Sequence, residues 1–241
     1  MSDIWERNVP LDWLRSFEVF EFRKKLILRH FKIKKGMKVL EAGSGPAHDS
    51  IAFAEKGAEV HALDLSENAL KLAQKYYGGL GLKVVTTQAD LKKISYPNNY
   101  FDFVWNAGTL EHFNDSDLEK IFSEMVRVTK KGGTILVLVP NKYYFWYQIS
   151  IRRAEHSHHH RQYEYERAFS TFEVRNLFRK FKIKEIHSSG DFVYPKPGII
   201  SRKISIFDKP LKLVFSILEN SSSFSTLKSI VALESATWGK K

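Results

Sequence analysis

The chain has 241 residues, 43% of them hydrophobic, which is enough to bury the core of one α/β domain with an elaborated edge. It contains no cysteine, and this excludes a disulfide scaffold and any zinc–thiolate site. Its formal net charge of +11 leaves three kinds of anionic partner open: a small-molecule substrate, a nucleic acid and a membrane surface.

The positive charge is concentrated at the two ends of the chain. Residues 1–38 contain 10 basic residues (lysine or arginine) and 5 acidic ones (aspartate or glutamate). Residues 39–141 contain 10 basic and 13 acidic residues, and residues 142–241 contain 18 basic and 9 acidic residues. A solvated, lysine-rich surface explains these basic flanks as well as an anionic partner does.

The N-terminal residues lack the basic and then apolar run of a signal peptide. The longest apolar strand core, residues 135–139, is far shorter than a membrane span. We therefore expect a soluble, cytoplasmic protein.

Residues 11–31 have apolar positions that predict one or two helices packed on the domain. From residue 38 to residue 139, strand-like and helix-like segments alternate, which predicts a parallel sheet with crossover helices. The predicted strands are residues 38–42, 59–63, 83–87, 101–105 and 135–139. The predicted helices are residues 46–56, a helix capped by Ser66 that ends at Gly78-Gly79, and a helix capped by Asp115 or Ser116.

The pattern changes after Pro140. Residues 142–151 are dense in aromatic side chains, Ser170 is expected to cap a further helix, and residues 181–187 are expected to form a strand. Residues 190–226 are irregular apart from one amphipathic stretch, residues 211–218, and residues 230–233 are the expected last strand.

A glycine-containing loop follows the first predicted strand. Gly43 and Gly45 stand between a strand and a helix, where the chain must turn tightly and the backbone can approach a ligand closely. Asp64 ends the next strand, 21 residues after Gly43, where an acid can accept hydrogen bonds from ribose hydroxyls. The alternative is a plain turn with Asp64 as a helix cap, but the strand context together with the acid favours a nucleotide site.

The residues around this loop indicate which nucleotide it binds. A dinucleotide loop requires glycine or alanine at position 48, and this chain has His48 there. Glu41 lies immediately before the loop, where its charge would repel a pyrophosphate. S-adenosylmethionine (SAM) carries an ammonium and a sulfonium and no phosphate, so Glu41 favours SAM over NAD.

Six segments then follow one another along residues 38–141. They are Val39-Leu40-Glu41-Ala42-Gly43-Ser44-Gly45, Ala62-Leu63-Asp64-Leu65-Ser66, Ala89-Asp90-Leu91, Phe101-Asp102-Phe103-Val104, Leu110-Glu111-His112 and Lys130-Lys131-Gly132-Gly133. In this order they resemble the methyltransferase type 11 group of the class I SAM-dependent methyltransferases, which includes ubiquinone and menaquinone biosynthesis enzymes. The resemblance covers about two-fifths of the chain.

The resemblance implies an α/β, Rossmann-like fold. Its sheet would be seven-stranded and mostly parallel, with the last strand inserted antiparallel, helices on both faces and a substrate-lid insertion. We therefore expect a single domain over residues 1–241, made of N-terminal helices (1–37), a SAM-binding core (38–141) and a substrate-binding elaboration with the last strands (142–241).

The resemblance also implies that SAM is the cofactor and assigns residues to it. Glu41 and the loop would hold the methionine part, Asp64 the ribose and Asp90 the adenine amino group, with Leu65 and Leu91 on either side of the adenine ring. An alternative for Asp90 is a helix or turn cap. The full predicted cofactor set is Glu41, Ala42, Gly43, Ser44, Gly45, Asp64, Leu65, Asp90, Leu91 and Asn106.

Methyl transfer from a sulfonium needs a base only when the acceptor must lose a proton. His112, just past strand four, is the candidate for that role, and the alternative is that it only structures the loop over the cofactor. No metal is predicted, because strand four ends in Asn106 rather than an aspartate. The histidines of residues 156–160 are interpreted as a polar loop, with a base or ligand role for one of them as the alternative.

The acceptor is expected to be a small molecule, anionic or aromatic. An RNA methyltransferase is the alternative, because residues 23–38 hold eight basic residues and no acid. Against it, strand four leads into Asn106-Ala107-Gly108-Thr109, not the proline-containing tetrad that grips a flipped base. A non-catalytic SAM-binding module and a peripheral membrane contact through residues 211–218 are further alternatives. The sequence indicates no oligomeric state.

Overall fold

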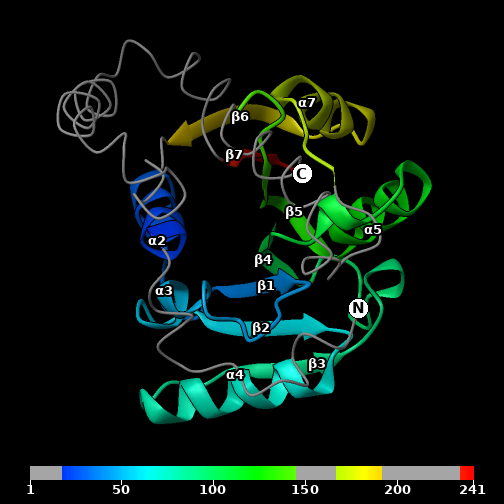
Figure 1. Ribbon diagram of the computed structural model, residues 1–241. Helices are drawn as coiled ribbons and strands as arrows, with labels where there is room; N and C mark the ends of the chain where they lie inside the picture. The colour runs from blue at the N-terminus through cyan, green and yellow to red at the C-terminus, as the bar shows by residue number, and fades with distance from the viewer. Residues whose placement is uncertain (1–17, 145–166, 192–233) are drawn as a thin grey trace, which may run out of the picture.

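The computed structural model describes residues 18–144, 167–191 and 234–241 of the chain (Figure 1). Within these residues seven strands form one sheet in the order β3-β2-β1-β4-β5-β7-β6. The strands are β1 (Lys38–Ala42), β2 (Glu59–Asp64), β3 (Val85–Gln88), β4 (Phe101–Ala107), β5 (Thr129–Pro140), β6 (Lys184–Asp191) and β7 (Glu234–Lys240).

The strand directions confirm the expected architecture. β1 to β5 pair in parallel, and β7 pairs antiparallel with both β5 and β6. β7 therefore lies between two strands that run the opposite way. The expected last strand, residues 230–233, falls outside the described residues, and the strand begins at Glu234. The sequence of β7, Glu-Ser-Ala-Thr-Trp-Gly-Lys, contains few β-branched residues and so has a low strand propensity. The segment forms a strand because it pairs with a neighbouring strand on each edge.

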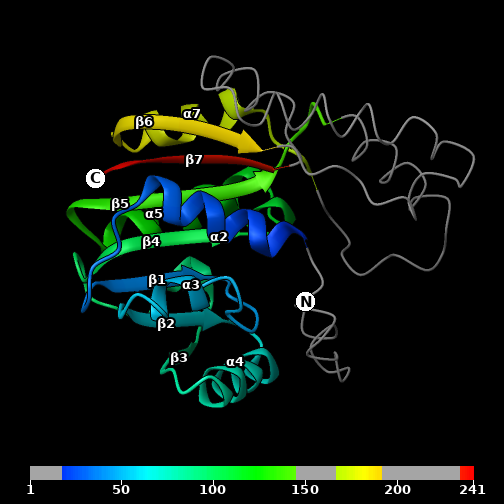
Figure 2. The same ribbon diagram turned by 90° about the vertical axis from the view of Figure 1, so that its left-hand side faces the viewer.

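Helices cover both faces of the sheet, as predicted. α2 (Glu18–His30), α3 (Ile51–Ala54) and α4 (Glu67–Gly79) bury apolar side chains in one core, and α5 (Asp115–Val128) and α7 (Thr171–Lys180) bury theirs in the other. Figure 2 shows α2 in front of the sheet and α5 behind it. Because both faces are covered, the central strands are buried on both sides, and Val39, Leu40, Val104 and Ile135 are all fully enclosed.

Side-chain caps fix where the longer helices begin. The Ser66 hydroxyl accepts from the Ala69 amide at 3.2 Å, and Ser170 forms a capping box with Glu173, so both predicted caps are confirmed. α4 ends at Gly79, which confirms the predicted stop at Gly78-Gly79. α5 is capped by Asn114, not by Asp115 or Ser116, because the Asn114 side chain accepts from the Asp117 amide.

The helix predicted over residues 46–56 is wrong in its extent. Only Ile51–Ala54 is helical, because Gly45 and Ala47 have φ angles of 49° and 52°, which a right-handed helix does not allow. Residues 43–50 therefore form a long loop above the end of β1. The predicted strands 83–87 and 181–187 are displaced toward the C-terminus, to Val85–Gln88 and Lys184–Asp191.

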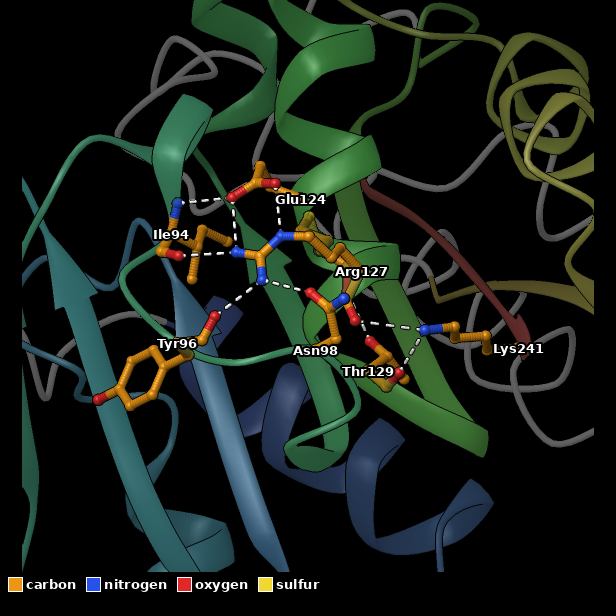
Figure 3. Close-up of polar contacts among 8 residues, drawn as sticks. Ile94, Tyr96, Asn98, Glu124, Arg127, Thr129 and Lys241 are labelled. Carbon is orange, nitrogen blue, oxygen red and sulfur yellow. Dashed lines mark hydrogen bonds and ion pairs between the residues drawn. The ribbon is translucent and has the colours of Figure 1, made fainter.

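Arg127 at the end of α5 holds the segment that leads into β4 (Figure 3). Its guanidinium donates to the carbonyls of Ile94 and Tyr96, each at 2.8 Å, and pairs with Glu124 at 2.7 Å. Glu124 in turn accepts from the Ile94 amide at 2.8 Å. A planar guanidinium can make these bonds at once because its donors point in several fixed directions.

Several predicted features fall outside the described residues. They are the aromatic segment beyond Tyr144, the histidines of residues 156–160, and residues 192–226 with the amphipathic stretch 211–218. In the part of the chain that the structure describes, no helix is long and apolar enough to cross a membrane.

Candidate active site

The candidate site lies where β1, β2 and β4 end. Three connections meet there: the loop of residues 43–50 after β1, the turn after β2, and the 3₁₀ helix η2 (Leu110–His112) after β4. In open α/β sheets, ligands bind outside the carboxyl ends of the strands, beside the point where the strand order reverses. β1 is that point, because β2 and β4 flank it on opposite sides.

The loop after β1 requires glycine at its first position. Gly43 has a φ of 72°, and a Cβ added to it would lie 2.7 Å from Cγ2 of Thr109. The Thr109 hydroxyl also donates to the Gly43 carbonyl at 2.9 Å. The amides of Gly43 and Ser44 both donate to the Leu63 carbonyl, at 2.8 and 3.0 Å. Contacts from β2 and from the segment after β4 therefore hold the loop in place.

Asp64 ties this loop to the turn after β2. One carboxylate oxygen accepts from the Gly45 amide at 2.7 Å, and the other accepts from the Ser66 amide at 2.9 Å. Each carboxylate oxygen has a second lone pair, so these bonds leave capacity for hydroxyl donors. The ribose contact stays a prediction. Leu65, the residue after Asp64, is 61% exposed. It therefore offers an apolar surface beside the loop, where the adenine ring is expected.

Glu41 is the buried acid of the site. It is 3% exposed, and its Oε2 atom has no hydrogen-bond partner among the described residues. Burial raises the pKa of Glu41 well above its usual range, and the nearby charges of Asp49 and Asp64 raise it further. A hydrogen bond from Ser50 and the charge of Arg23 act in the opposite direction. A cationic group placed against Oε2 would satisfy it and favour its ionised form.

Arg23 reaches this end of the sheet from α2 and was missed as a site residue. It pairs with Asp49 in the loop and with both oxygens of Glu234 at the start of β7, at 2.6 and 3.0 Å. Burial opposes the charge of Arg23, but the ion pairs with Glu234 and Asp49 outweigh burial and raise its pKa. No local pattern identifies these three residues, because they lie in different segments and meet only in the fold.

The charges of the site favour a cation over an anion. Among the described residues, four acids lie around the loop with the Arg23 guanidinium; they are Glu41, Asp49, Asp64 and Glu234. A pyrophosphate would meet a net negative charge, whereas the ammonium and sulfonium of SAM would be attracted. This arrangement fits the expected cofactor.

The remaining cofactor residues keep their assignments as predictions. Asp90 caps the 3₁₀ helix η1 (Leu91–Lys93) by accepting a hydrogen bond from the Lys92 amide at 2.9 Å. This is the helix-cap role that the sequence left open as the alternative for Asp90. Its carboxylate is half exposed, and Leu91 beside it is buried. The Asn106 side chain is fully buried, donates to the Ala42 carbonyl and accepts from the Leu110 amide at 3.3 Å. Asn106 thus positions the end of β1 and the start of η2.

His112 ends η2, and its backbone amide donates to the Thr109 carbonyl at 3.1 Å. Thr109 is the residue that contacts Gly43, so His112 follows directly on the segment that touches the glycine loop. Its catalytic role stays a prediction. In the described ranges, no group of three or more His, Asp or Glu residues could hold a metal ion, and residues 156–160 lie outside those ranges.

Comparisons with known proteins agree with this geometry. The model of the methyltransferase domain family matches residues 39–133. Over 159 residues the chain is 31% identical to a demethylmenaquinone methyltransferase of Geobacillus stearothermophilus, covering 58% of this chain and 67% of that protein. It is also 31% identical to the ubiquinone/menaquinone biosynthesis C-methyltransferase UbiE of Bordetella parapertussis, over 49% of each chain. The chain spans about half to two thirds of the length of these relatives.

Solved structures share the fold. A SAM-dependent methyltransferase from Archaeoglobus fulgidus matches 92% of this chain and 94% of its own with a TM-score of 0.64 at 17% identity. A phosphoethanolamine N-methyltransferase of Haemonchus contortus, solved with SAM, matches 91% of this chain and 52% of its own with a TM-score of 0.58 at 20% identity. The sheet order, the glycine loop with its buried acid and the 31% identity together establish that the chain belongs to the class I SAM-dependent methyltransferases.

Proposed function

We propose that this protein transfers a methyl group from SAM to a small aromatic acceptor. The observation that carries the proposal is the Oε2 atom of Glu41, which is buried without a hydrogen-bond partner among the described residues at the end of β1. It stands in a group of acids with a single arginine, which suits the ammonium of the SAM methionine. When bound, SAM supplies an electrophilic methyl group on a sulfonium leaving group.

In this proposal the glycine loop and Glu41 hold the methionine part, Asp64 the ribose, and Asp90 with Leu65 and Leu91 the adenine. Ala42, Ser44 and Asn106 complete the contacts. Asp64 suits its role because it is already fixed by two backbone amides, so its remaining lone pairs point in set directions. Such fixed groups align the reacting atoms and exclude water, which supplies much of the acceleration of an in-line transfer.

His112 is proposed as the base that removes a proton from the acceptor. A phenolic or hydroquinone acceptor has such a proton, and the ring nitrogen of a neutral imidazole can accept it. The names of the relatives point to this class, because the demethylmenaquinone and ubiquinone/menaquinone enzymes are named for quinone biosynthesis. Whether methylation occurs at carbon or at oxygen would follow from which acceptor atom faces the methyl group.

The test is a methylation assay with radiolabelled SAM on a deproteinised small-molecule extract and, separately, on total RNA. Label in the small-molecule fraction, with formation of S-adenosylhomocysteine, is the expected result. Label only in RNA would replace the proposed acceptor with the RNA alternative. SAM binding without S-adenosylhomocysteine in either reaction would support the non-catalytic module instead.

A further inference from the structure

The opposite end of the sheet carries a band of lysines. This is the left-hand edge in Figure 2, where β1, β4, β5 and β6 begin and β7 ends. The lysines come from four segments: the linker between α2 and β1, the start of β5, the segment from the end of α7 to the first residue of β6, and the end of β7. We call them the basic edge; they are Lys32, Lys34, Lys35, Lys131, Lys182, Lys184, Lys240 and Lys241.

Acids do not balance this charge. Two carboxylates, Asp102 and Glu185, line the cleft beside the lysines, against five lysine side chains (Lys32, Lys34, Lys130, Lys131 and Lys240). Asp102 is already bound by the Lys130 ammonium at 2.7 Å and the Lys38 amide at 2.8 Å. Among the described residues, no ion pair involves Lys32, Lys34 or Lys131. Burial lowers the pKa of Lys241, and the positive charges of Lys131 and Arg127 lower it further.

Four lysines of the basic edge, Lys32, Lys34, Lys131 and Lys240, line a cleft of about 530 Å³. Its apolar floor includes Trp238, whose ring lies 4.9 Å from His30 and 5.8 Å from His187 between ring centroids. Because these two histidines already contact the indole ring, it is not an open platform for a stacked base. Recognition at this edge therefore rests on charge.

Helix dipoles explain only part of the basic charge. The described helices run against the parallel strands, so their negative C-terminal ends also meet this edge, and cations in their last turns offset that charge. Arg29, His30, Arg127, Arg179 and Lys180 occupy such positions. The lysines of the basic edge lie outside those helices, in linkers and strands. Compensation of the helix dipoles therefore does not account for their positive charge.

We propose that the basic edge binds the phosphodiester backbone of a nucleic acid. The lysines follow the sheet from β1 through β4, β5 and β7 to β6, and with about 4.8 Å between neighbouring strands the band is roughly 20 Å long. That length matches several successive phosphates rather than a single phosphate group. An anionic membrane fits less well, because none of the large exposed hydrophobic residues in the described ranges belongs to the segments that supply the band; they are Leu28, Leu65, Leu80, Val85, Tyr143 and Phe172.

This binding takes place away from methyl transfer. The five residues of β1 separate the basic edge from the glycine loop, a distance of roughly 17 Å at about 3.3 Å per residue. A backbone held at the basic edge therefore does not by itself bring a base to the methyl donor. The basic edge would dock the protein on nucleic acid, and the acceptor site would remain a separate site.

The experiment is fluorescence anisotropy of a labelled single-stranded RNA of about 15 nucleotides, titrated with the full chain at several salt concentrations. The test variant is Lys32→Glu/Lys34→Glu/Lys131→Glu. We expect the wild type to bind with a steep salt dependence, and the variant to bind at least about tenfold more weakly near 50 mM salt. Its logarithmic salt slope should fall by about 2, since each lost contact on a single strand contributes about 0.7.

The matched control is Lys71→Glu/Lys75→Glu/Lys120→Glu on α4 and α5, which makes the same change in net charge elsewhere. Equal weakening in both triple variants, or no binding by the wild type at low salt, would overturn the proposal. So would sedimentation with phosphatidylserine-containing vesicles in the absence of RNA binding. SAM affinity, measured by calorimetry, should be unchanged in the test variant and so show that it is folded.

Discussion

Gly43 and Thr109 contact each other so closely that no side chain fits between them. Gly43→Ala would place a methyl group 2.7 Å from Thr109 at a backbone φ of 72°. Gly36→Ala is the control, because Gly36 has a φ of 79° and nothing within 4 Å of the added atom. In thermal denaturation the control should lose only about 1–2 kcal/mol from left-handed strain. Gly43→Ala should lose more and also weaken SAM binding; equal losses would contradict the close contact.

Glu41 should make the free protein less stable at high pH. Burial, with the charge of Asp49, raises its pKa, so the folded state holds the proton more tightly than the unfolded state does. That stabilisation is present near pH 4.5, the usual value for glutamate, and is lost as the pH rises through the raised pKa. Glu41→Gln has no such proton to lose and should melt at a higher temperature than the wild type at about pH 8. Each kcal/mol of difference in the free energy of unfolding should raise the melting temperature by about 2–4 °C.

The check is thermal denaturation of the two proteins, without SAM, across this pH range. The difference in melting temperature between Glu41→Gln and the wild type should grow with pH. A constant difference from low to high pH would show that burial does not shift the titration of Glu41.

At the scale of elements, Arg23 joins three segments that are distant in sequence. It links α2 to the loop after β1 through Asp49 and to β7 through Glu234. Arg23→Met would leave two partly buried carboxylates without their cation, and breaking such a pair costs about 3–5 kcal/mol. Lys24→Met is the control, because its 3.0 Å pair with Glu55 is more exposed and surface pairs contribute about 0–1 kcal/mol. Chemical denaturation that gave both variants the same stability would contradict this account of α2.

The elements that the sequence predicted well have strong local signals. Ser66 and Ser170 cap helices because a hydroxyl can accept from an amide three residues on, and the strand at β1 is an apolar run bounded by a glycine loop. α3 was overestimated because the left-handed backbone at Ala47 leaves no trace in the apolar pattern. A last strand was predicted, but at residues 230–233; residues Glu234–Lys240 were not recognised because the partners of β7, not its composition, make it a strand.

In the whole molecule, the two ends of the sheet carry opposite charge. Acids gather where β1 and β2 end, and lysines gather where β1, β5 and β6 begin. The sequence showed basic flanks but not this division, which depends on how the chain folds back. Arg23 illustrates the difference: it belongs to the basic run of residues 23–38, yet the fold places it among the acids of the site and Lys32 and Lys34 at the other end.

That Glu41, Gly43 and Asp64 lie together at the candidate site was predictable, because their motif is local to the loop. Asp49 and Glu234 were not predictable, since their role depends on Arg23 reaching them from another helix.

The most direct test of the central claim is calorimetric titration of SAM into the full chain in two buffers of different ionisation enthalpy. If the cation of SAM is held by Glu41, binding ionises this carboxyl and releases a proton, so the observed heat depends on the buffer. Glu41→Gln should bind SAM at least about tenfold more weakly and without proton release, because truncating one partner of a buried charge pair costs about 2–5 kcal/mol. Equal affinity in wild type and variant, with no proton released by either, would contradict the assignment of Glu41 and the proposed cofactor site.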